Sequence, residues 1–448
     1  MRMYIRLVIG VSALLTLSCK QENPVRGELR SPPRESAPIA PSSTPHTAQG
    51  RPIPDQASAE SKQTGTAVDS RRADIAWQPG AVIDAPSKEA LVGFGQSGAV
   101  TEEYLFIGAP GDGAKRPGPG RVHVFRKQTG TWRPAGVLTA PKTSKAVTSF
   151  GETLHIRGKE LWIGAPEIVE KPAGPGAVFI YRSVGNTWRL VETLTPPDGK
   201  KGDGFGSAIA TTRNKACIGA KQGDGRKRDT GAVYCFKKER GKWRRRQKLT
   251  PKRPVRGGWF GASIVMDDTS LLVGAPRSDP KGEMSGAVTA YRRKGDKWGK
   301  GGVLIPKTIY EASFFGDEMA LDGDRVVINE PCLSPRGIGA AHVYRRNKGK
   351  WIYEQQLKPE DAEAEYQIGE SVGFFNGDVL IGAPGIGSIY VFGRNDSGRW
   401  TEKPLIERTG GHGRFGHFVA TSPSSVLVGD FNYNNPNHPV EGCGVVYE

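Results

Sequence analysis

One stretch of this chain has the residue types and spacing of a nucleophilic site. Gly369-Glu370-Ser371-Val372-Gly373 matches the G-x-S-x-G pattern, in which a sharp strand-to-helix turn exposes the serine hydroxyl. The match falls on a repeated strand pattern, in which Ser97, Ser207 and Ser263 hold similar positions. We therefore interpret the match as a coincidence and predict no catalytic residue.

Metal and cofactor chemistry is not indicated either. The seven His are scattered, with no H-E-x-x-H pattern and no metal-ligand spacing. Gly411-His412-Gly413-Arg414-Phe415-Gly416 matches the phosphate-binding pattern G-x-G-x-x-G, but no helix is expected after it. We expect no cofactor and no metal ion.

Anion binding is better supported, because basic residues are concentrated along one strand. The chain has a formal net charge of +17, which favours anionic partners. Strand alternation predicts that three basic residues share a face, opposite Trp243 and Leu249: Arg244, Arg246 and Lys248. This strand is either a charged edge that stops sheets from pairing with other chains or a polyanion-binding patch. Two neighbouring loops carry five more candidate residues: Arg226, Lys227, Arg228, Arg277 and Lys281.

The elements that would position these residues form a repeated unit. A Phe-Gly pair opens each repeat, with Ile368-Gly369 in the sixth register, and the phenylalanines are Phe94, Phe150, Phe205, Phe260, Phe315 and Phe415. Gly-Ala-Pro follows in four repeats, and degenerate copies stand at 219–221, 329–331 and 429–431. Each repeat has four short β runs with turn residues between them. Seven such units predict an all-β fold, a seven-bladed β-propeller of four-stranded antiparallel blades.

These motifs resemble the FG-GAP repeats of integrin alpha-chain propellers and their bacterial relatives, over roughly residues 75–448. The resemblance implies a seven-bladed propeller, and it implies binding more often than catalysis. Integrin-type repeats often carry calcium loops between the first two strands. The turns at 101–103, 157–159, 212–214, 267–269, 322–324, 376–378 and 422–424 are too short to offer the five to seven oxygens of such a loop.

The two ends of the predicted propeller complement each other. Residues 75–86, led by Trp77, match the fourth strand of a blade, whereas the C-terminus stops after a third strand. We therefore predict that the N-terminal strand pairs with the C-terminal blade and closes the ring, which leaves no open sheet edge at the seam.

The N-terminus indicates export. Residues 1–18 have the basic start and short apolar run of a signal peptide. Cys19 follows directly, and the segment resembles a bacterial lipoprotein signal in which this cysteine is lipidated. Residues 19–73 are rich in Pro and Ser and read as a disordered tether, and 74–448 form the propeller. We expect a lipid anchor in the cell envelope, with Lys20 favouring the outer membrane; the propeller would face the periplasm or the surface.

Two cysteines have the spacing for a disulfide. If Gly219 pairs with Val233 in antiparallel strands, Cys217 lies opposite Cys235. In an oxidising compartment the two could be bridged, and otherwise they are small buried apolar residues.

We expect a non-catalytic binding or scaffold propeller whose partners are the membrane, through the anchor, and an envelope protein or an anionic polymer such as lipopolysaccharide or an acidic glycan. Nucleic acid is not an expected partner of an exported protein. The loops that follow Gly-Ala-Pro are the expected binding face. The alternative is a lectin or hydrolase that uses the central funnel or pockets between blades. An enzyme should show acids, His or Ser clustered at one strand end, and no such cluster is evident in the sequence.

Overall fold

The computed structural model describes residues 79–84, 93–111, 119–141, 148–167, 172, 174–225, 228–331, 337–408, 414–430 and 443–447. The predicted signal peptide, Cys19, the tether and Trp77 lie outside these residues, as do Arg226 and Lys227. Within the described part, no helix has the length and apolar character needed to cross a membrane.

The described chain folds into seven antiparallel sheets of four strands each, which are the predicted seven blades. Blade 1 consists of β2 (Ser97–Val100), β3 (Tyr104–Ala109), β4 (Arg121–Gln128) and β5 (Thr131–Leu138). Blade 2 consists of β6 (Thr153–Arg157), β7 (Glu160–Ala165), β8 (Ala177–Val184) and β9 (Thr187–Leu194). Blade 3 consists of β10 (Phe205–Thr211), β11 (Lys215–Ala220), β12 (Ala232–Glu239) and β13 (Lys242–Leu249).

The next three blades repeat this order. Blade 4 consists of β14 (Ile264–Met266), β15 (Ser270–Ala275), β16 (Ala287–Lys294) and β17 (Lys297–Leu304). Blade 5 consists of β18 (Met319–Asp322), β19 (Arg325–Glu330), β20 (Ala340–Asn347) and β21 (Lys350–Leu357). Blade 6 follows a short 3₁₀ turn (Ala364–Tyr366) and consists of β22 (Val372–Phe375), β23 (Asp378–Ala383), β24 (Ser388–Arg394) and β25 (Trp400–Glu407).

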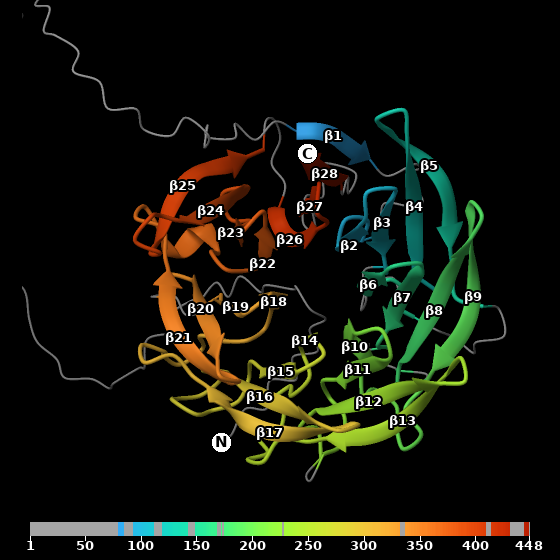
Figure 1. Ribbon diagram of the computed structural model, residues 1–448, viewed down its shortest axis with the longest axis horizontal. Helices are drawn as coiled ribbons and strands as arrows, with labels where there is room; N and C mark the ends of the chain where they lie inside the picture. Colours follow the sequence, from blue (N-terminus) through green and yellow to red (C-terminus); the bar gives the residue numbers. More distant parts are fainter. Residues whose placement is uncertain are drawn as a thin grey trace, which may run out of the picture. The chain divides into compact units, whose positions relative to one another are not determined.

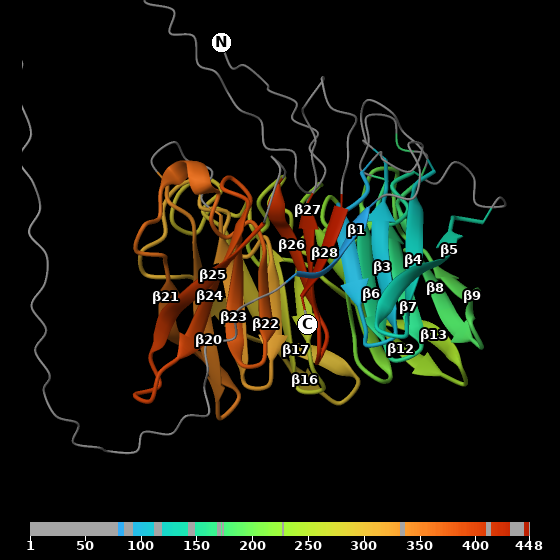
Figure 2. The same cartoon turned by 90° about the horizontal axis from the view of Figure 1, so that it is seen from above.

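Blade 7 closes the ring as predicted. It consists of β26 (Phe415–Thr421), β27 (Val426–Asp430), β28 (Cys443–Tyr447) and, from the other end of the chain, β1 (Pro79–Asp84). β1 pairs antiparallel with β28, so that Val82 faces Val445. Figures 1 and 2 both show β1 beside β28 at the seam of the ring. The N-terminal strand therefore completes the C-terminal blade.

The Phe-Gly and Gly-Ala-Pro motifs hold neighbouring blades together. The ring of Phe205 is fully buried between Trp162 of blade 2 and Tyr234 of blade 3. Gly261, after Phe260, has a φ of +93°, a conformation that residues with a Cβ rarely adopt. A Cβ on Gly219 would lie 2.0 Å from the carbonyl oxygen of Gly261. Glycine is therefore required on both sides of this contact between blades.

One prediction about the outer strand of blade 3 is wrong. The pairing of β12 with β13 contains a β-bulge, at which the register skips Arg246. Because a bulge interrupts alternation, Trp243 packs against blade 2 whereas Leu249 packs against blade 4. The predicted common face of Arg244, Arg246 and Lys248 therefore does not form. Blades 1 to 6 all have an irregularity in this pairing.

The inner strands of blade 3 have the predicted register. Gly219 pairs with Val233 and Cys217 with Cys235. The Cα atoms of the two cysteines are 4.2 Å apart, and the structure has a disulfide between them. Both side chains are buried, so that the bridge ties two strands inside one blade.

Candidate functional site

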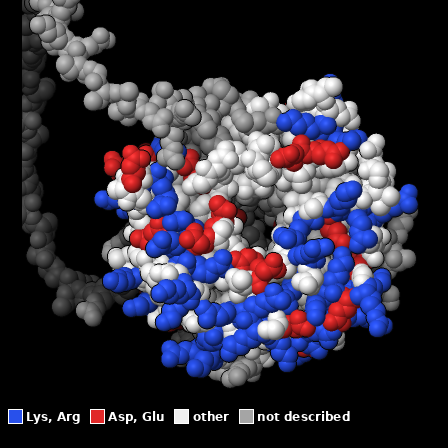
Figure 3. All heavy atoms as spheres, in the orientation of Figure 1, with Lys and Arg blue, Asp and Glu red and all other residues white. Residues whose placement is uncertain are grey.

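The antiparallel strands give the propeller two distinct faces, between which they run in Figure 2. The turns between the first and second strands and between the third and fourth strands lie on one face, which we call the turn face. The loops that follow Gly-Ala-Pro lie on the other, the loop face. In blades 1 to 6 the third strand ends in basic residues at the turn face: Arg126-Lys127, Arg182, Lys237-Lys238, Arg292-Arg293, Arg345-Arg346 and Arg394. Figure 3 views this face and shows Lys and Arg gathered over β12, β13, β16 and β17.

Several of these cations pair with acids of a neighbouring blade. Lys238 of blade 3 lies 2.7 Å from Glu160 of blade 2, and Lys237 lies 2.7 Å from Asp296 of blade 4. Arg346 of blade 5 is 2.5 Å from Asp267 of blade 4. Ion pairs near the surface stabilise a fold only modestly, but these link successive blades on the turn face.

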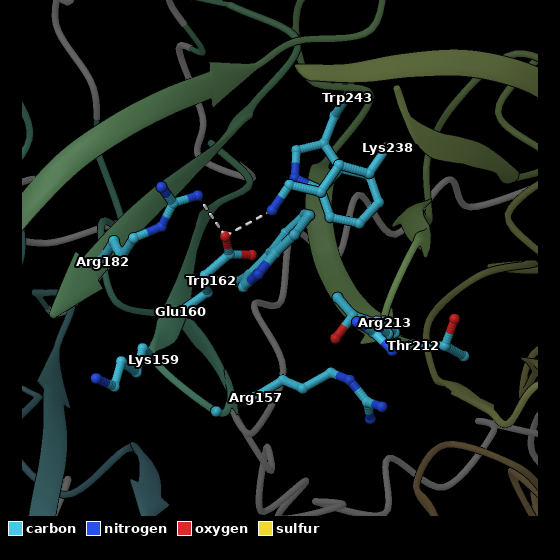
Figure 4. Close-up of a pocket in the computed structure, with 11 residues that line it drawn as sticks. Arg157, Lys159, Glu160, Trp162, Arg182, Thr212, Arg213, Lys238 and Trp243 are labelled. Carbon is cyan, nitrogen blue, oxygen red and sulfur yellow. Dashed lines mark hydrogen bonds and ion pairs between the residues drawn. The ribbon is translucent and has the colours of Figure 1, made fainter. Parts of the chain in front are cut away.

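A pocket of about 400 Å³ opens between blades 2 and 3 on the turn face (Figure 4). Five basic residues and one acid, Glu160, line it: Arg157, Lys159, Arg182, Arg213 and Lys238. Trp162 and Trp243 form its apolar wall, with their rings in an edge-to-face contact at 5.0 Å. The hydroxyl of Thr212 also lies at this pocket, buried and without a hydrogen-bond partner among the described residues.

Glu160 neutralises only part of this charge. Its carboxylate accepts hydrogen bonds from Arg182 and Lys238, each at 2.7 Å. Burial acts to raise the pKa of Glu160, but hydrogen bonds and charge from these two cations outweigh it and hold the pKa below its usual value. Arg157, Lys159 and Arg213 are exposed. Since no acid among the described residues pairs with these three, they give the pocket a net positive charge.

A second pocket, of about 830 Å³, lies between blades 4 and 5 on the same face. Arg292, Arg293, Arg346 and Lys348 line it together with one acid, Asp268. Arg292 stands opposite the first residue of β15, as Arg182 stands opposite the first residue of β7. The two pockets therefore occupy equivalent positions in the repeat, and both are basic.

The described candidate residues from the sequence lie in different local environments. Lys248 pairs with Asp198 at 2.8 Å, and Arg246 pairs with Glu239. Arg244 is exposed on β13, and Lys281 is exposed in the loop after β15. Arg228 lies 3.7 Å from its neighbour Asp229. The guanidinium of Arg277 is partly buried and stacks on Trp259, 3.7 Å from the ring centre.

Ser371, within the G-x-S-x-G match, holds two blades together. Its buried hydroxyl donates a hydrogen bond to the carbonyl oxygen of Gly416 in blade 7, at 2.8 Å. Ser97 and Ser263 make the same contact with the Phe-Gly glycine of the next blade, each at 2.6 Å. This repeated hydrogen bond indicates a structural role for Ser371. The strand-to-helix turn of a G-x-S-x-G nucleophile does not occur there, because Ser371 is followed by β22 and β23.

The expectation that no acids or His cluster at one strand end is wrong. Four titratable residues, each from a different blade, interact electrostatically with one another or with the same lysine, Lys221. Each stands two positions after the phenylalanine of Phe-Gly or its equivalent, and they are Glu152, Asp317, Glu370 and His417. His417 lies 3.5 Å from Glu370. Burial raises the pKa of Asp317 to about 6. Among the described residues, no group of three His, Cys, Asp or Glu could hold a metal ion.

The sequence did contain the signals for both features. In blades 1 to 6 a cation follows the aromatic residue of the third strand within two positions, and the four residues Glu152, Asp317, Glu370 and His417 stand at a fixed distance from the Phe-Gly motif or its equivalent. Each blade contributes only one or two residues, so that neither cluster is visible as a local motif.

Comparison with known proteins agrees with this architecture. The FG-GAP repeat family model matches residues 188–236 and 243–291. Each matched segment starts at the outer strand of one blade and ends in the third strand of the next. No match was found among curated proteins.

Solved structures show the fold alone. A candidate 6-phosphogluconolactonase from Bacteroides uniformis has 9% sequence identity and a TM-score of 0.50, over 70% of this chain and 85% of its own. A protein from Lactobacillus plantarum has 14% identity and a TM-score of 0.50, over 74% and 92%. The periplasmic gluconolactonase of Pseudomonas aeruginosa has 11% identity and a TM-score of 0.48, over 69% and 85%.

Proposed function

The chain is an FG-GAP repeat β-propeller, and we propose that it is a non-catalytic binding module that captures anionic polymers on its turn face. The observation that carries the proposal is the pocket between blades 2 and 3. There Arg157, Lys159 and Arg213 are exposed beside an acid that is already paired with two other cations. Guanidinium groups suit carboxylate, sulfate and phosphate because they offer paired donors.

The arrangement of the two pockets favours a polymer over a single small anion. Both pockets lie on the turn face at equivalent positions of the repeat. Between them, blades 3 and 4 present further exposed cations at their hairpin turns, including Arg240, Lys242 and Lys294. A chain of negative charges can contact successive basic groups on such a surface, and its association should weaken as salt screens the charges.

We place this module in the cell envelope. The N-terminal pattern supports export and lipidation of Cys19, and the stretch from 19 to 73 would act as a tether. The Cys217–Cys235 disulfide suits an oxidising compartment. Lipopolysaccharide phosphates and acidic glycans are the anionic polymers of that location, and they are the partners we propose, with an envelope protein as the other possible partner.

The test reverses the charge of the three unpaired cations. A variant with Arg157→Glu, Lys159→Glu and Arg213→Glu should lose most of its binding to lipopolysaccharide or an acidic glycan at low salt, with little change in Tm. The matched control reverses Arg228, Lys252 and Lys281, which are exposed on the loop face. Equal binding by the parent and both variants would contradict the proposal. Loss only in the control variant would move the site away from the turn face.

A second candidate function is a hydrolase or lectin in the central funnel. The group of Glu152, Asp317, Glu370 and His417, one residue from each of four blades, supports it, since carboxyl and imidazole groups can transfer protons. The candidate 6-phosphogluconolactonase that shares the fold makes lactones a reasonable first substrate class. If the intact propeller hydrolyses a lactone and Glu370→Gln does not, the enzyme is supported. If the intact propeller hydrolyses no lactone, the lactonase candidate fails and the binding module remains the proposal.

A further inference from the structure

The three degenerate Gly-Ala-Pro motifs each bring a charged residue into the protein interior. Lys221 in blade 3 stands where other blades have Pro, whereas Glu330 in blade 5 and Asp430 in blade 7 stand where others have Ala. Their exposed fractions are 0%, 3% and 1%. A buried charge is costly unless it is paired or hydrogen-bonded. The hydrogen-bond and ion-pair partners of these three residues therefore indicate whether each buried charge has a structural role.

The two acids find their partners inside the protein. Glu330 accepts a hydrogen bond from the Ser313 hydroxyl at 2.8 Å and contacts His342 Nε2 at 2.5 Å. Asp430 forms an ion pair with Arg408. Each of these acids is thus paired with a neighbouring side chain inside the protein, although the second carboxylate oxygen of Asp430, Oδ1, has no hydrogen-bond partner among the described residues.

Lys221 differs from both. Its Nζ has no hydrogen-bond partner among the described residues, although the side chain is fully buried. It lies 4.9 Å from the centre of the Trp259 ring. Arg277 stacks on the same ring at 3.7 Å, and its buried Nε has no hydrogen-bond partner among the described residues either. A cation–π contact recovers only part of the lost hydration of an ammonium group.

The interactions of Lys221 place it near the central axis. It belongs to blade 3, yet it interacts electrostatically with Glu152 of blade 2, Arg277 of blade 4 and Asp317 of blade 5. Blades 3 and 5 are not neighbours in the ring (Figure 1), and only near the axis can one side chain reach groups on all of these blades. Lys221 directly follows β11, so this is the loop-face end of the axis, opposite the turn face.

We propose that Lys221 and Arg277, together with Trp259, form a binding site for one small oxyanion, a carboxylate or a phosphate group, at the loop-face end of the axis. The anion would accept hydrogen bonds from Lys221 Nζ and Arg277 Nε, neither of which has an acceptor among the described residues. The neighbouring carboxyl groups of Glu152 and Asp317 limit the site to a single negative group and disfavour a polyanion. This site is separate from the turn-face pockets, and it does not depend on polymer binding.

The chemistry of Lys221 agrees with this role. Burial is the main cause that lowers its pKa, and the charges of Glu152 and Asp317 only partly oppose that effect. An anionic oxygen beside the amine would stabilise its charged form. Binding should therefore be strongest where the amine is protonated, and it should weaken as the pH rises through the lowered pKa.

The experiment measures Tm with inorganic phosphate and with acetate as probes. At a hundredfold excess over its Kd, a bound anion should raise the Tm of the propeller by a few degrees. Lys221→Met should abolish this rise. Its Tm without anion should equal or exceed that of the parent, because an unpartnered buried ammonium group is removed. Glu330→Gln is the matched control at a degenerate motif: it should lower Tm and keep the rise.

The turn-face variant with Arg157, Lys159 and Arg213 reversed separates this site from the proposed polymer site, and it should keep the full rise. Several results would overturn the inference. These are a rise of equal size in Lys221→Met, no rise with either anion, or loss of the rise in the turn-face variant. A clear drop in the Tm of Lys221→Met without anion would also overturn it, because that drop would mean that the amine is satisfied within the protein.

Discussion

Substituting Gly274 with Ala tests the contact that holds blade 4 to blade 5. The added Cβ would lie 2.0 Å from the carbonyl oxygen of Gly316 and 2.2 Å from the hydroxyl of Ser263. That hydroxyl donates a 2.6 Å hydrogen bond to the same carbonyl. The methyl group therefore both pushes the two blades apart and displaces the bond that joins them.

The expected cost follows from these two effects. Overpacking a close contact costs about 1–3 kcal/mol, and losing a buried hydrogen bond costs about 1 kcal/mol more. The free energy of unfolding should fall by about 2–4 kcal/mol, which is a drop in Tm of roughly 3–5 °C for a propeller of this size, because the unfolding entropy is about 2.1 cal/mol/K per residue. Calorimetry or thermal unfolding followed by circular dichroism measures it.

Gly302→Ala, in the outer strand of the same blade, is the matched control. A Cβ there meets no atom within 4 Å. Alanine should be neutral or stabilise slightly, because it restricts the unfolded chain. If both variants melt at the same temperature, the glycine of Gly-Ala-Pro is not needed for close approach of the blades, and our explanation of the motif fails.

Four further outcomes are expected. Deleting residues 74–87 removes β1 and leaves blade 7 with three strands, so Tm should fall clearly; an unchanged Tm would contradict closure of the ring by β1. The pKa of Asp317 is raised to about 6 from 3.8, so this group lowers the free energy of unfolding of the parent protein as the pH rises from about 4 to 6. Asp317→Asn has no such group, and its Tm should therefore rise relative to the parent's over that pH range. Alkylation without reductant, read by mass spectrometry, should leave Cys217 and Cys235 unmodified. Millimolar calcium added to chelated protein should leave Tm unchanged, and a clear rise would show a site that the short turns do not reveal.

The blades could be predicted because each blade meets the same packing requirement. A ring between neighbouring sheets needs Phe, and a backbone that passes 2.0 Å from a hypothetical Cβ needs Gly, as at Gly219 and Gly261. Most units therefore carry the same residues at a similar spacing. Closure of the ring could be predicted by counting strands at the two ends of the propeller. The N-terminal end has one strand without a blade and the C-terminal blade lacks its fourth strand, so the two complete each other.

The sites were harder to predict, for two physical reasons. Alternation fails at a bulge, and the bulge at Arg246 leaves no special residue in the sequence to mark it. The second reason is that the clusters form between blades. Glu160 and Lys238 are far apart along the chain, yet they meet at 2.7 Å because two blades stack. Such contacts follow from the geometry of the ring, which the order of strands alone does not supply.

The pairing of β1 with β28 also governs when the propeller can be completed. Among the described strands, β1 is synthesised first and β28 last. Six blades can form from local strands while synthesis continues, but the seventh needs both β1 and β28. Bringing its ends together costs loop-closure entropy, which grows only slowly with length. We therefore expect the seam to form last, and a chain truncated before β28 leaves β1 without its partner.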